Sequence, residues 1–186
     1  MGDPRRLKKK YKTPNNPYEK DRLVEELALL GKFGLRNKKE LRKHKYALSH
    51  FRQLARENRA LPEALQQIRF ADLRDSVAKL NLISEDASTD DVLSLTIENI
   101  LERRLQTFVF KLGLAKSIIQ ARQLITHRHI SVRGNPIDSP SYIVKKNDEE
   151  QIKYAVNSPF YKDSSKIWSG AQSLKKSADD KAVEEF

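Results

Sequence analysis

The sequence predicts an α+β protein, with a mostly helical N-terminal domain, a small module of two helices and an antiparallel sheet, and an extended basic N-terminal arm. Apolar residues recur at helical spacing over most of residues 18–126. The apolar period then changes to two, because Ile130 and Val132 alternate with polar residues. The arm is expected over residues 1–17, whose three prolines and six basic residues oppose both helix and core formation.

The helical domain is expected over residues 18–95, and its first helix over about residues 18–32. Acidic Glu19 and Asp21 come early in this helix, as the helix dipole prefers. Gly34 follows its end, where glycine commonly stops a helix. The apolar face assigned to this helix consists of Leu23, Val24, Leu27, Ala28 and Leu30.

A second, strongly basic helix is expected from residue 38 to about residue 58. Asn37 and Glu40 have the spacing of a capping box at its start. Its charged surface indicates a phosphate-facing side and carries Lys38, Lys39, Arg42, Lys43, Lys45, Arg52, Arg56 and Arg59. Residues 61–82 favour one or two further helices, and residues 84–91 favour an acidic loop.

The small module is expected over residues 96–160. It begins with a helix over about 96–112, and a second helix follows up to about Thr126. Ser117 and Gln120 have capping-box spacing at the start of that second helix. Further short strands are expected at residues 141–145 and 151–154. Residues 161–186 form a polar tail that is expected to be flexible, with Trp168 able to pin it to a surface.

Positive charge is unevenly distributed along the chain. There are 36 basic and 25 acidic residues, which gives a net charge of +11. Residues 103–137 contain seven basic residues and no acidic residue, whereas residues 61–102 contain three basic and nine acidic residues. Because the basic stretch also has the apolar spacing of a folded unit, it predicts a binding surface for a polyanion, in the first place a nucleic acid.

The composition and motifs argue against several other classes of protein. There is no cysteine, and therefore no disulfide, thiolate zinc site or thiol catalysis. His127 and His129 lack nearby further ligands for a metal, and no nucleophile elbow or Gly-rich phosphate loop is present. No signal peptide or membrane-spanning stretch occurs. We therefore expect a cytoplasmic protein that is not an enzyme, with no catalytic residues, metal, cofactor, membrane partner or homo-oligomer.

Residues 103–144 resemble the RNA-binding module that is named after ribosomal small-subunit protein four, also called the alpha-L module. The shared elements are Arg104-Leu105, Gly113-Leu114-Ala115, Ala121-Arg122-Gln123-Leu124, and His129-Ile130 with Val132 and Gly134. The resemblance implies RNA binding. Many members of that family have Gly where this chain has Arg128. In a tight turn from helix to strand, Arg128 lacks the conformational freedom of Gly, but its side chain adds a phosphate contact.

The resemblance extends over about residues 1–160 to the small-subunit ribosomal protein four family in its archaeal form. The segments that carry it are Met1-Gly2-Asp3-Pro4, Tyr11 to Pro14, Gly34-Leu35-Arg36-Asn37-Lys38 and Asp91-Val92-Leu93-Ser94-Leu95-Thr96. It implies a structural constituent of the small subunit that binds ribosomal RNA early in assembly and lies near the side where messenger RNA enters. The implied partners are ribosomal RNA, neighbouring small-subunit proteins and messenger RNA. The alternatives are a related pre-ribosomal processing factor and an accessory domain of an RNA-modifying enzyme.

The candidate RNA-binding residues combine cations with hydrogen-bonding groups of the module. Arg clamps phosphate with two parallel hydrogen bonds, Lys acts as a point charge, and the start of the helix after Ser117 offers free backbone N–H groups. The candidates are Arg5, Arg6, Lys8, Lys9, Lys10, Arg36, Lys38, Lys39, Arg42, Lys43, Arg103, Arg104, Lys111, Lys116, Ser117, Arg122, Gln123, His127, Arg128, His129 and Arg133. Of these, Arg104, Lys116 and Arg122 are expected to lie off the buried faces.

Overall fold

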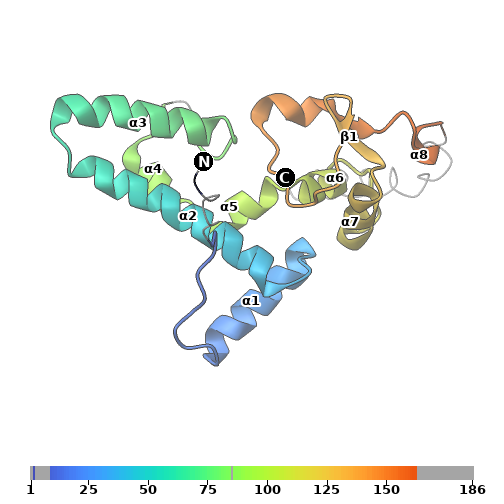
Figure 1. Cartoon of the computed structure of the whole chain (residues 1–186), viewed down its shortest axis with the longest axis horizontal. Helices are drawn as coiled ribbons and strands as arrows, with labels where there is room; N and C mark the ends of the chain where they lie inside the picture. Colours follow the sequence, from blue (N-terminus) through green and yellow to red (C-terminus); the bar gives the residue numbers. More distant parts are fainter. Residues whose placement is uncertain (1, 3–8, 85, 163–186) are drawn as a thin grey trace, which may run out of the picture. The chain divides into compact units, whose positions relative to one another are not determined.

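The chain forms two compact units, Met1–Arg103 and Arg104–Phe186, in a computed structural model that describes residue 2, residues 9–84 and residues 86–162 (Figure 1). The division falls later than the boundary predicted at residues 95 and 96. The candidates Arg5, Arg6 and Lys8, most of the predicted tail and Trp168 lie outside the described residues.

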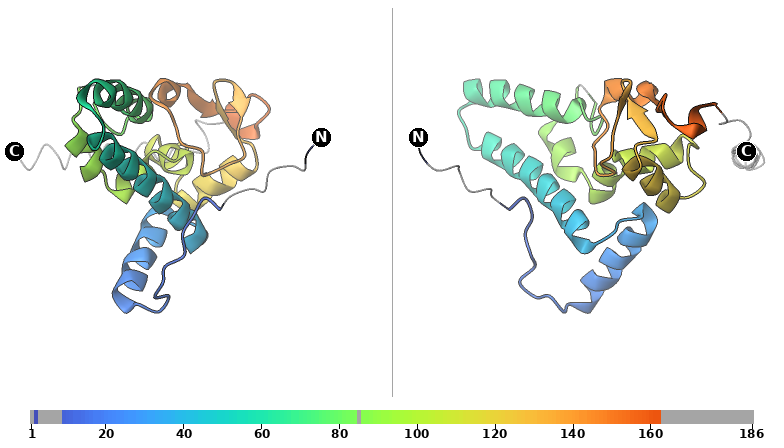
Figure 2. Two further views of the ribbon diagram at one scale, coloured as in Figure 1. Left: turned by 60° about the vertical axis from the view of Figure 1, so that its left-hand side comes forward. Right: turned by 45° about the vertical axis from the view of Figure 1, so that its right-hand side comes forward.

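All the regular secondary structure in the described residues of the first unit is helical. Its helices are α1 Lys20–Phe33, α2 Lys38–Arg59, α3 Glu63–Ala78, α4 Thr89–Ser94 and α5 Ile97–Glu102. Helix α2 contacts each of the other four, and Figure 2 shows it running between α1 and α3. The long basic helix is therefore the central element of this unit.

The start of α2 is fixed by the predicted cap. The backbone N–H of Glu40 donates to Oδ1 of Asn37 at 3.0 Å, and Asn37 itself is extended. One stripe of the helix is buried at alternating spacings of three and four residues. Its members, all buried except the half-buried Phe51, are Leu41, His44, Leu48, Phe51, Ala55 and Asn58. Because this stripe faces the interior along the whole helix, the basic side chains lie along the rest of the helix.

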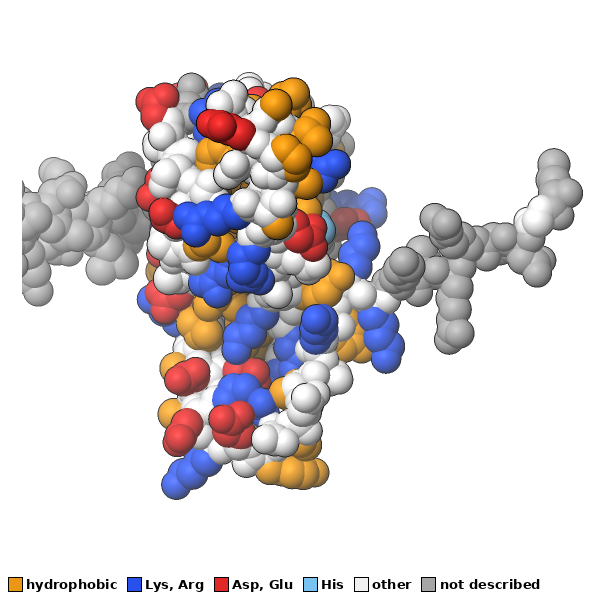
Figure 3. Space-filling model, turned by 90° about the vertical axis from the view of Figure 1, so that its left-hand side faces the viewer, with side chains coloured by type: hydrophobic (Ala, Val, Ile, Leu, Met, Phe, Trp, Pro, Cys, Tyr) orange, Lys and Arg blue, Asp and Glu red, His pale blue; other side chains and the backbone are white. Residues whose placement is uncertain are grey.

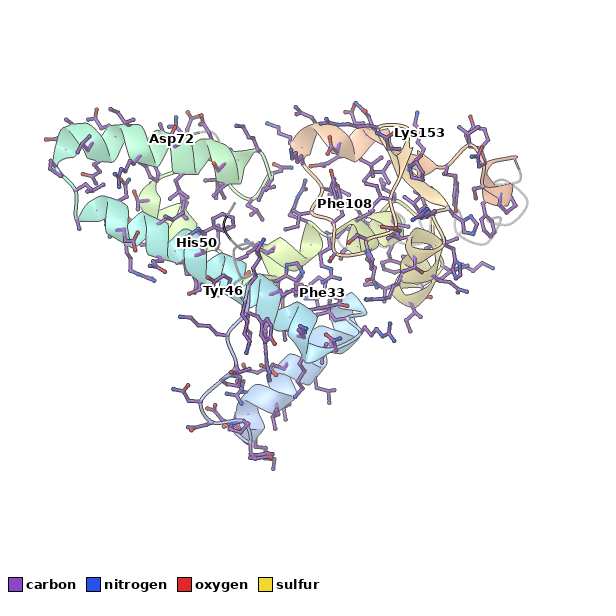
Figure 4. All side chains as sticks on the ribbon, in the orientation of Figure 1. Phe33, Tyr46, His50, Asp72, Phe108 and Lys153 are labelled. Atoms are coloured by element: carbon purple, nitrogen blue, oxygen red, sulfur yellow. The ribbon has the colours of Figure 1, made fainter. Side chains whose placement is uncertain are left out.

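Helix α1 buries a different face from the predicted one. Val24 and Leu27 are 60% and 67% exposed, whereas Glu26 and Phe33 are buried. Phe33 packs with Leu35 of the following turn, and Figure 4 shows it where α1 meets the beginning of α2. The prediction was wrong because it counted apolar residues alone, and the inner stripe of this helix contains a carboxylate.

The helix predicted over 96–112 is two helices. Helix α5 ends at Glu102, and α6 Leu105–Lys111 begins the second unit. Arg104 between them is extended and forms a β-bridge with Ile143. The backbone N–H of Leu105 donates to the carbonyl of Tyr142 at 2.8 Å. Both helices bury an apolar face, so the apolar spacing continues across the break and conceals it.

The second unit combines helices with a small antiparallel sheet, which confirms the α+β prediction. The sheet has the strand order β2-β1-β3, and Ser131 of β1 pairs with Pro136 on one side and Lys153 on the other. Figure 4 labels Lys153 on the sheet and Phe108 on α6. The remaining elements are α7 Ile118–Thr126, β1 Ile130–Val132, β2 Asn135–Pro136, the 3-10 helix η1 Lys146–Gln151, β3 Ile152–Tyr154 and α8 Pro159–Lys162.

The core of this unit joins the two helices to the sheet. Its buried members are Leu105, Val109, Ala115, Ala121, Leu124, Ile125, Ile130, Val132, Val144, Ile152 and Tyr154. The strand predicted at 151–154 is present as β3, whereas residues 141–145 contribute only the single bridge at Ile143. All three residues of β1 are buried, including Ser131, and of these Ile130 and Val132 belong to the apolar core.

Candidate nucleic-acid interface

The start of α7 is capped by two hydrogen bonds. Oγ of Ser117 accepts from the backbone N–H of Gln120 at 3.2 Å, and Oε1 of Gln120 accepts from the backbone N–H of Lys116 at 3.0 Å. The predicted N-cap at Ser117 is therefore confirmed, whereas the Gln120 side chain binds the N–H of Lys116 and not that of Ser117, as a full capping box would require. Lys116 and Ser117 are exposed at the positive end of the helix dipole, so an anion at this end meets both favourable polarity and a cation.

Arg122 is anchored to the interior of the second unit. Nη1 of Arg122 donates to Oε1 of the fully buried Gln106 at 3.4 Å, and Nε2 of Gln106 donates to the carbonyl of Ile118 at 2.9 Å. Arg122 is half-buried, whereas the neighbouring Gln123 is exposed. A guanidinium held in this way loses little rotational freedom when it contacts a phosphate.

The turn between α7 and β1 contains His127, Arg128 and His129. Arg128 has φ +60°, in the left-handed region that favours glycine. Its Nη2 lies 3.0 Å from Oδ2 of Asp138, and both side chains are more than half exposed. The imidazole rings of His127 and His129 are 6.3 Å apart, and Nδ1 of His129 lies 3.1 Å from Oγ of Ser158. The turn therefore exposes both the guanidinium of Arg128 and the imidazole ring of His127.

Arg133 lies in the hairpin turn and is tied to a buried carboxylate. Arg133 and Gly134 both have positive φ, 53° and 80°, as a two-residue hairpin turn of type I′ requires. The Arg133 guanidinium forms an ion pair with Asp148, which is 1% exposed. The hydroxyl of Tyr142 donates to Asp148 at 3.1 Å, and burial, together with this hydrogen bond, raises the pKa of Tyr142. Arg133 therefore also holds the hairpin to the rest of the unit.

Arg103 and Arg104 do not lie on the surface. Arg104 is 0% exposed and Arg103 is 8% exposed. The expectation that Arg104 lies off the buried face was wrong, because the chain is extended at this residue and pairs with Ile143. We leave both residues out of the proposed RNA contacts, while Lys111 at the end of α6 is exposed.

In the first unit, the basic residues around the α1–α2 turn have different surroundings. Arg36 and Lys43 are exposed. Nζ of Lys38 lies 3.6 Å from Oε2 of buried Glu26, and Nζ of Lys39 lies 5.4 Å from the ring centre of Tyr11. The surface at this turn has a net positive charge, because the single carboxylate of Glu26 is shared by several cations.

The described part of the predicted arm has no regular secondary structure, but it lies against the helices. Lys9 and Lys10 are exposed. Lys12, Thr13 and Pro14 line a cavity of about 240 Å³ together with Arg22, Glu26, Arg42, Lys45, Tyr46 and Ser49. Nη2 of Arg22 also donates to the carbonyls of Asn16 and Pro17. Residues 12–14 therefore lie beside the basic surface of α2, and residues 16 and 17 contact α1.

The described residues show neither a metal site nor a membrane span. Across residues 9–84 and 86–162, no group of three or more His, Asp or Glu side chains is placed to hold a metal ion. In the same part of the chain, no helix combines the length and the apolar character that crossing a bilayer needs. The chemistry that this surface offers is the binding of anions by Lys and Arg.

The fold of the second unit defines an S4-domain protein: the family model of the S4 domain matches residues 103–150. Most of the chain is similar to curated proteins named small ribosomal subunit protein uS4. The protein from Ignicoccus hospitalis is 49% identical over 162 residues, which is 87% of this chain and 98% of the relative. Those from Hyperthermus butylicus and Sulfolobus acidocaldarius are 48% and 49% identical, over 87% and 86% of this chain and 92% of each relative. The chain belongs to the small ribosomal subunit protein uS4 family.

Proposed function

We propose that this chain is a structural constituent of the small ribosomal subunit and that it binds ribosomal RNA through both units. The observation that carries the proposal is its similarity, over nearly the full length of the relatives, to small-subunit ribosomal proteins. The charge distribution supports RNA as the ligand, since each unit exposes its own cluster of Lys and Arg. The role is one of binding and positioning, without catalysis.

The proposed contacts in the second unit come from three places on its surface. They are the start of α7 with Lys116 and Ser117, the anchored Arg122 with Gln123, and the turn with His127, Arg128 and His129. Lys111 adds a further cation. Because double-helical RNA hides its base edges in a deep groove, such cations recognise the shape of the phosphate backbone more than the base sequence.

The proposed contacts in the first unit are Lys9, Lys10, Arg36, Lys38, Lys39, Arg42 and Lys43. Arg5, Arg6 and Lys8, outside the described residues, extend this set toward the N-terminus. Arg133 completes the contacts proposed for the second unit. We further propose that the chain acts early in subunit assembly, near the side where messenger RNA enters and beside other small-subunit proteins. This role places the chain on the ribosome, in the cytoplasm.

Binding of the full chain to small-subunit ribosomal RNA is expected to weaken steeply with salt. Each neutralised phosphate contributes a slope of about −0.7 to −0.9 to a plot of log affinity against log salt concentration. With at least about five phosphates contacted, the slope should be roughly −3.5 or steeper. Filter binding between low and physiological salt measures it.

Matched variants identify where the salt dependence comes from. Replacing Lys116 and Arg128 with Gln should make the slope shallower by about one for each lost phosphate contact. Replacing Arg69 and Lys79, two exposed cations in the acidic part of the first unit, should leave it unchanged. A slope near zero for the unmodified chain would overturn the proposal of RNA binding.

A further inference from the structure

One side of α2 carries an unbroken row of basic side chains that contains a single hydroxyl. The positions alternate at spacings of four and three residues, which keeps them on the same side of a helix. The row consists of Lys38, Arg42, Lys45, Ser49, Arg52, Arg56 and Arg59. At 1.5 Å per residue it extends along about 30 Å of helix, with neighbours about 5 Å apart along the axis. Such a row suits a ligand with regularly spaced negative charges.

Three members of this row have a carboxylate at ion-pairing distance. Lys38 and Lys45 share the carboxylate of Glu26 at 3.6 and 3.7 Å, and Arg59 pairs with Asp90 at 2.5 Å. Among the described residues, Arg42 and Arg56 have no carboxylate at ion-pairing distance. Uncompensated positive charge therefore remains at Arg42 and Arg56, on either side of Ser49.

A recess opens beside this middle part, where α5 packs against α2. Its volume is about 450 Å³, and no carboxylate lines it. The lining residues are Lys45, Leu48, Ser49, Arg52, Arg56, Thr96 and Ile97. Lys45 and Ser49 also line the 240 Å³ cavity that reaches residues 12–14. The two hollows therefore share Lys45 and Ser49 as lining residues, and we refer to them together as the groove of α2. Figure 3 shows a band of Lys and Arg across the middle of one face, as expected from the position of α2 between α1 and α3.

Arg52 is held in place at the wall of this recess. Its Nη2 donates to the carbonyl of Leu95 at 2.6 Å, and its side chain is half-buried. A guanidinium has five N–H donors, so donors remain for a phosphate. Because the side chain is already immobilised by the protein, binding costs it little conformational entropy.

We propose that this groove binds the sugar–phosphate backbone of one RNA strand, with a phosphate held in the recess by Lys45, Arg52 and Arg56. The hydroxyl of Ser49 donates to the same phosphate, and Leu48 and Ile97 provide an apolar wall for the adjoining ribose. The site rests on the proposed function. It adds to that function an RNA contact in the first unit, which α2 and α5 form together. Regular spacing of the cations favours a polyanion of regular charge over an acidic protein segment.

Ser49 offers a nearly isosteric pair of variants for the test. Ser49→Asp introduces a carboxylate into the centre of the groove, four residues after Lys45 and three before Arg52, where opposite charges stabilise a helix. Ser49→Asn is its uncharged counterpart. We expect Ser49→Asp to keep or raise the melting temperature and to weaken binding of small-subunit ribosomal RNA by about tenfold relative to Ser49→Asn, because the new charge repels the phosphate. Arg56→Gln should weaken binding in the same direction without a change in melting temperature.

Filter binding, thermal melting and incorporation into subunits, each measured with the full chain, test whether the groove binds RNA. If Ser49→Asp and Ser49→Asn bind equally while Lys116→Gln with Arg128→Gln weakens binding, the groove does not contact RNA and the proposed function still stands. If the unmodified chain does not bind the RNA, the proposed function fails and the groove proposal fails with it. If Ser49→Asp leaves RNA binding intact but lowers incorporation into subunits, the groove takes an acidic protein segment, which also overturns the RNA site.

Discussion

Leu124→Ala is expected to lower the free energy of unfolding of the second unit by about 2–5 kcal/mol, which is the usual cost of truncating a buried leucine. Leu124 is 4% exposed and belongs to the core that joins α7 to the sheet. Truncation removes apolar contacts and leaves a cavity that the surrounding side chains fill only in part. Since Arg122 and the turn at Arg128 are positioned by α7, RNA affinity should fall together with stability.

Ile119 provides the control on the same helix. It is 74% exposed, so Ile119→Ala should change the free energy of unfolding by no more than about 0.5 kcal/mol. Thermal or denaturant unfolding of the full chain, followed by a signal from the second unit, measures both variants. Equal losses for Leu124→Ala and Ile119→Ala would contradict the assignment of the inner face of α7.

Glu26→Ala is expected to destabilise the first unit by about 2–3 kcal/mol. The buried Glu26 carboxylate attracts three cations, Arg22, Lys38 and Lys45, at 3.9, 3.6 and 3.7 Å. Its loss leaves three like charges close together without their shared counterion. We place the cost below the 3–5 kcal/mol typical of breaking a fully buried pair, because the three cations are partly exposed to solvent.

The neighbouring Glu25 tests whether position or charge decides this effect. Glu25 is exposed on the same helix, so Glu25→Ala should leave stability within about 0.5 kcal/mol of the unmodified chain. Both variants gain one net positive charge, and neither should lose RNA affinity under conditions where it remains folded. A Glu26→Ala variant as stable as Glu25→Ala would show that Glu26 does not join α1 to α2.

The second unit could be predicted well because its local signals agree with its packing. The cap at Ser117, the start of a strand after His129 and the turn at Gly134 all lie where their residue types favour them. The first helix was harder, because Glu26 lies in its inner stripe and the exposed Val24 and Leu27 gave a false apolar face. A buried charge with several partners on another helix cannot be identified from spacing within its own helix.

The candidate site shows the same limits. The basic row of α2 follows from spacing alone, whereas the recess depends on α5 packing against α2 and on the hydrogen bond from Arg52 to Leu95. Arginine is usually found at the surface, but Arg104 is buried because a long-range β-bridge to Ile143 places it inside. Which cations face a ligand and which hold the fold together is decided by tertiary contacts.

The central claim is that this chain is a constituent of the small ribosomal subunit. Quantitative mass spectrometry of mature small subunits, purified from the organism that carries the chain and washed at moderate salt, tests it most directly. The account predicts the chain at about one copy per subunit, in the same proportion as the other small-subunit proteins. Recovery of the chain only with immature precursor particles, and its absence from mature subunits, would contradict the account and identify a processing factor.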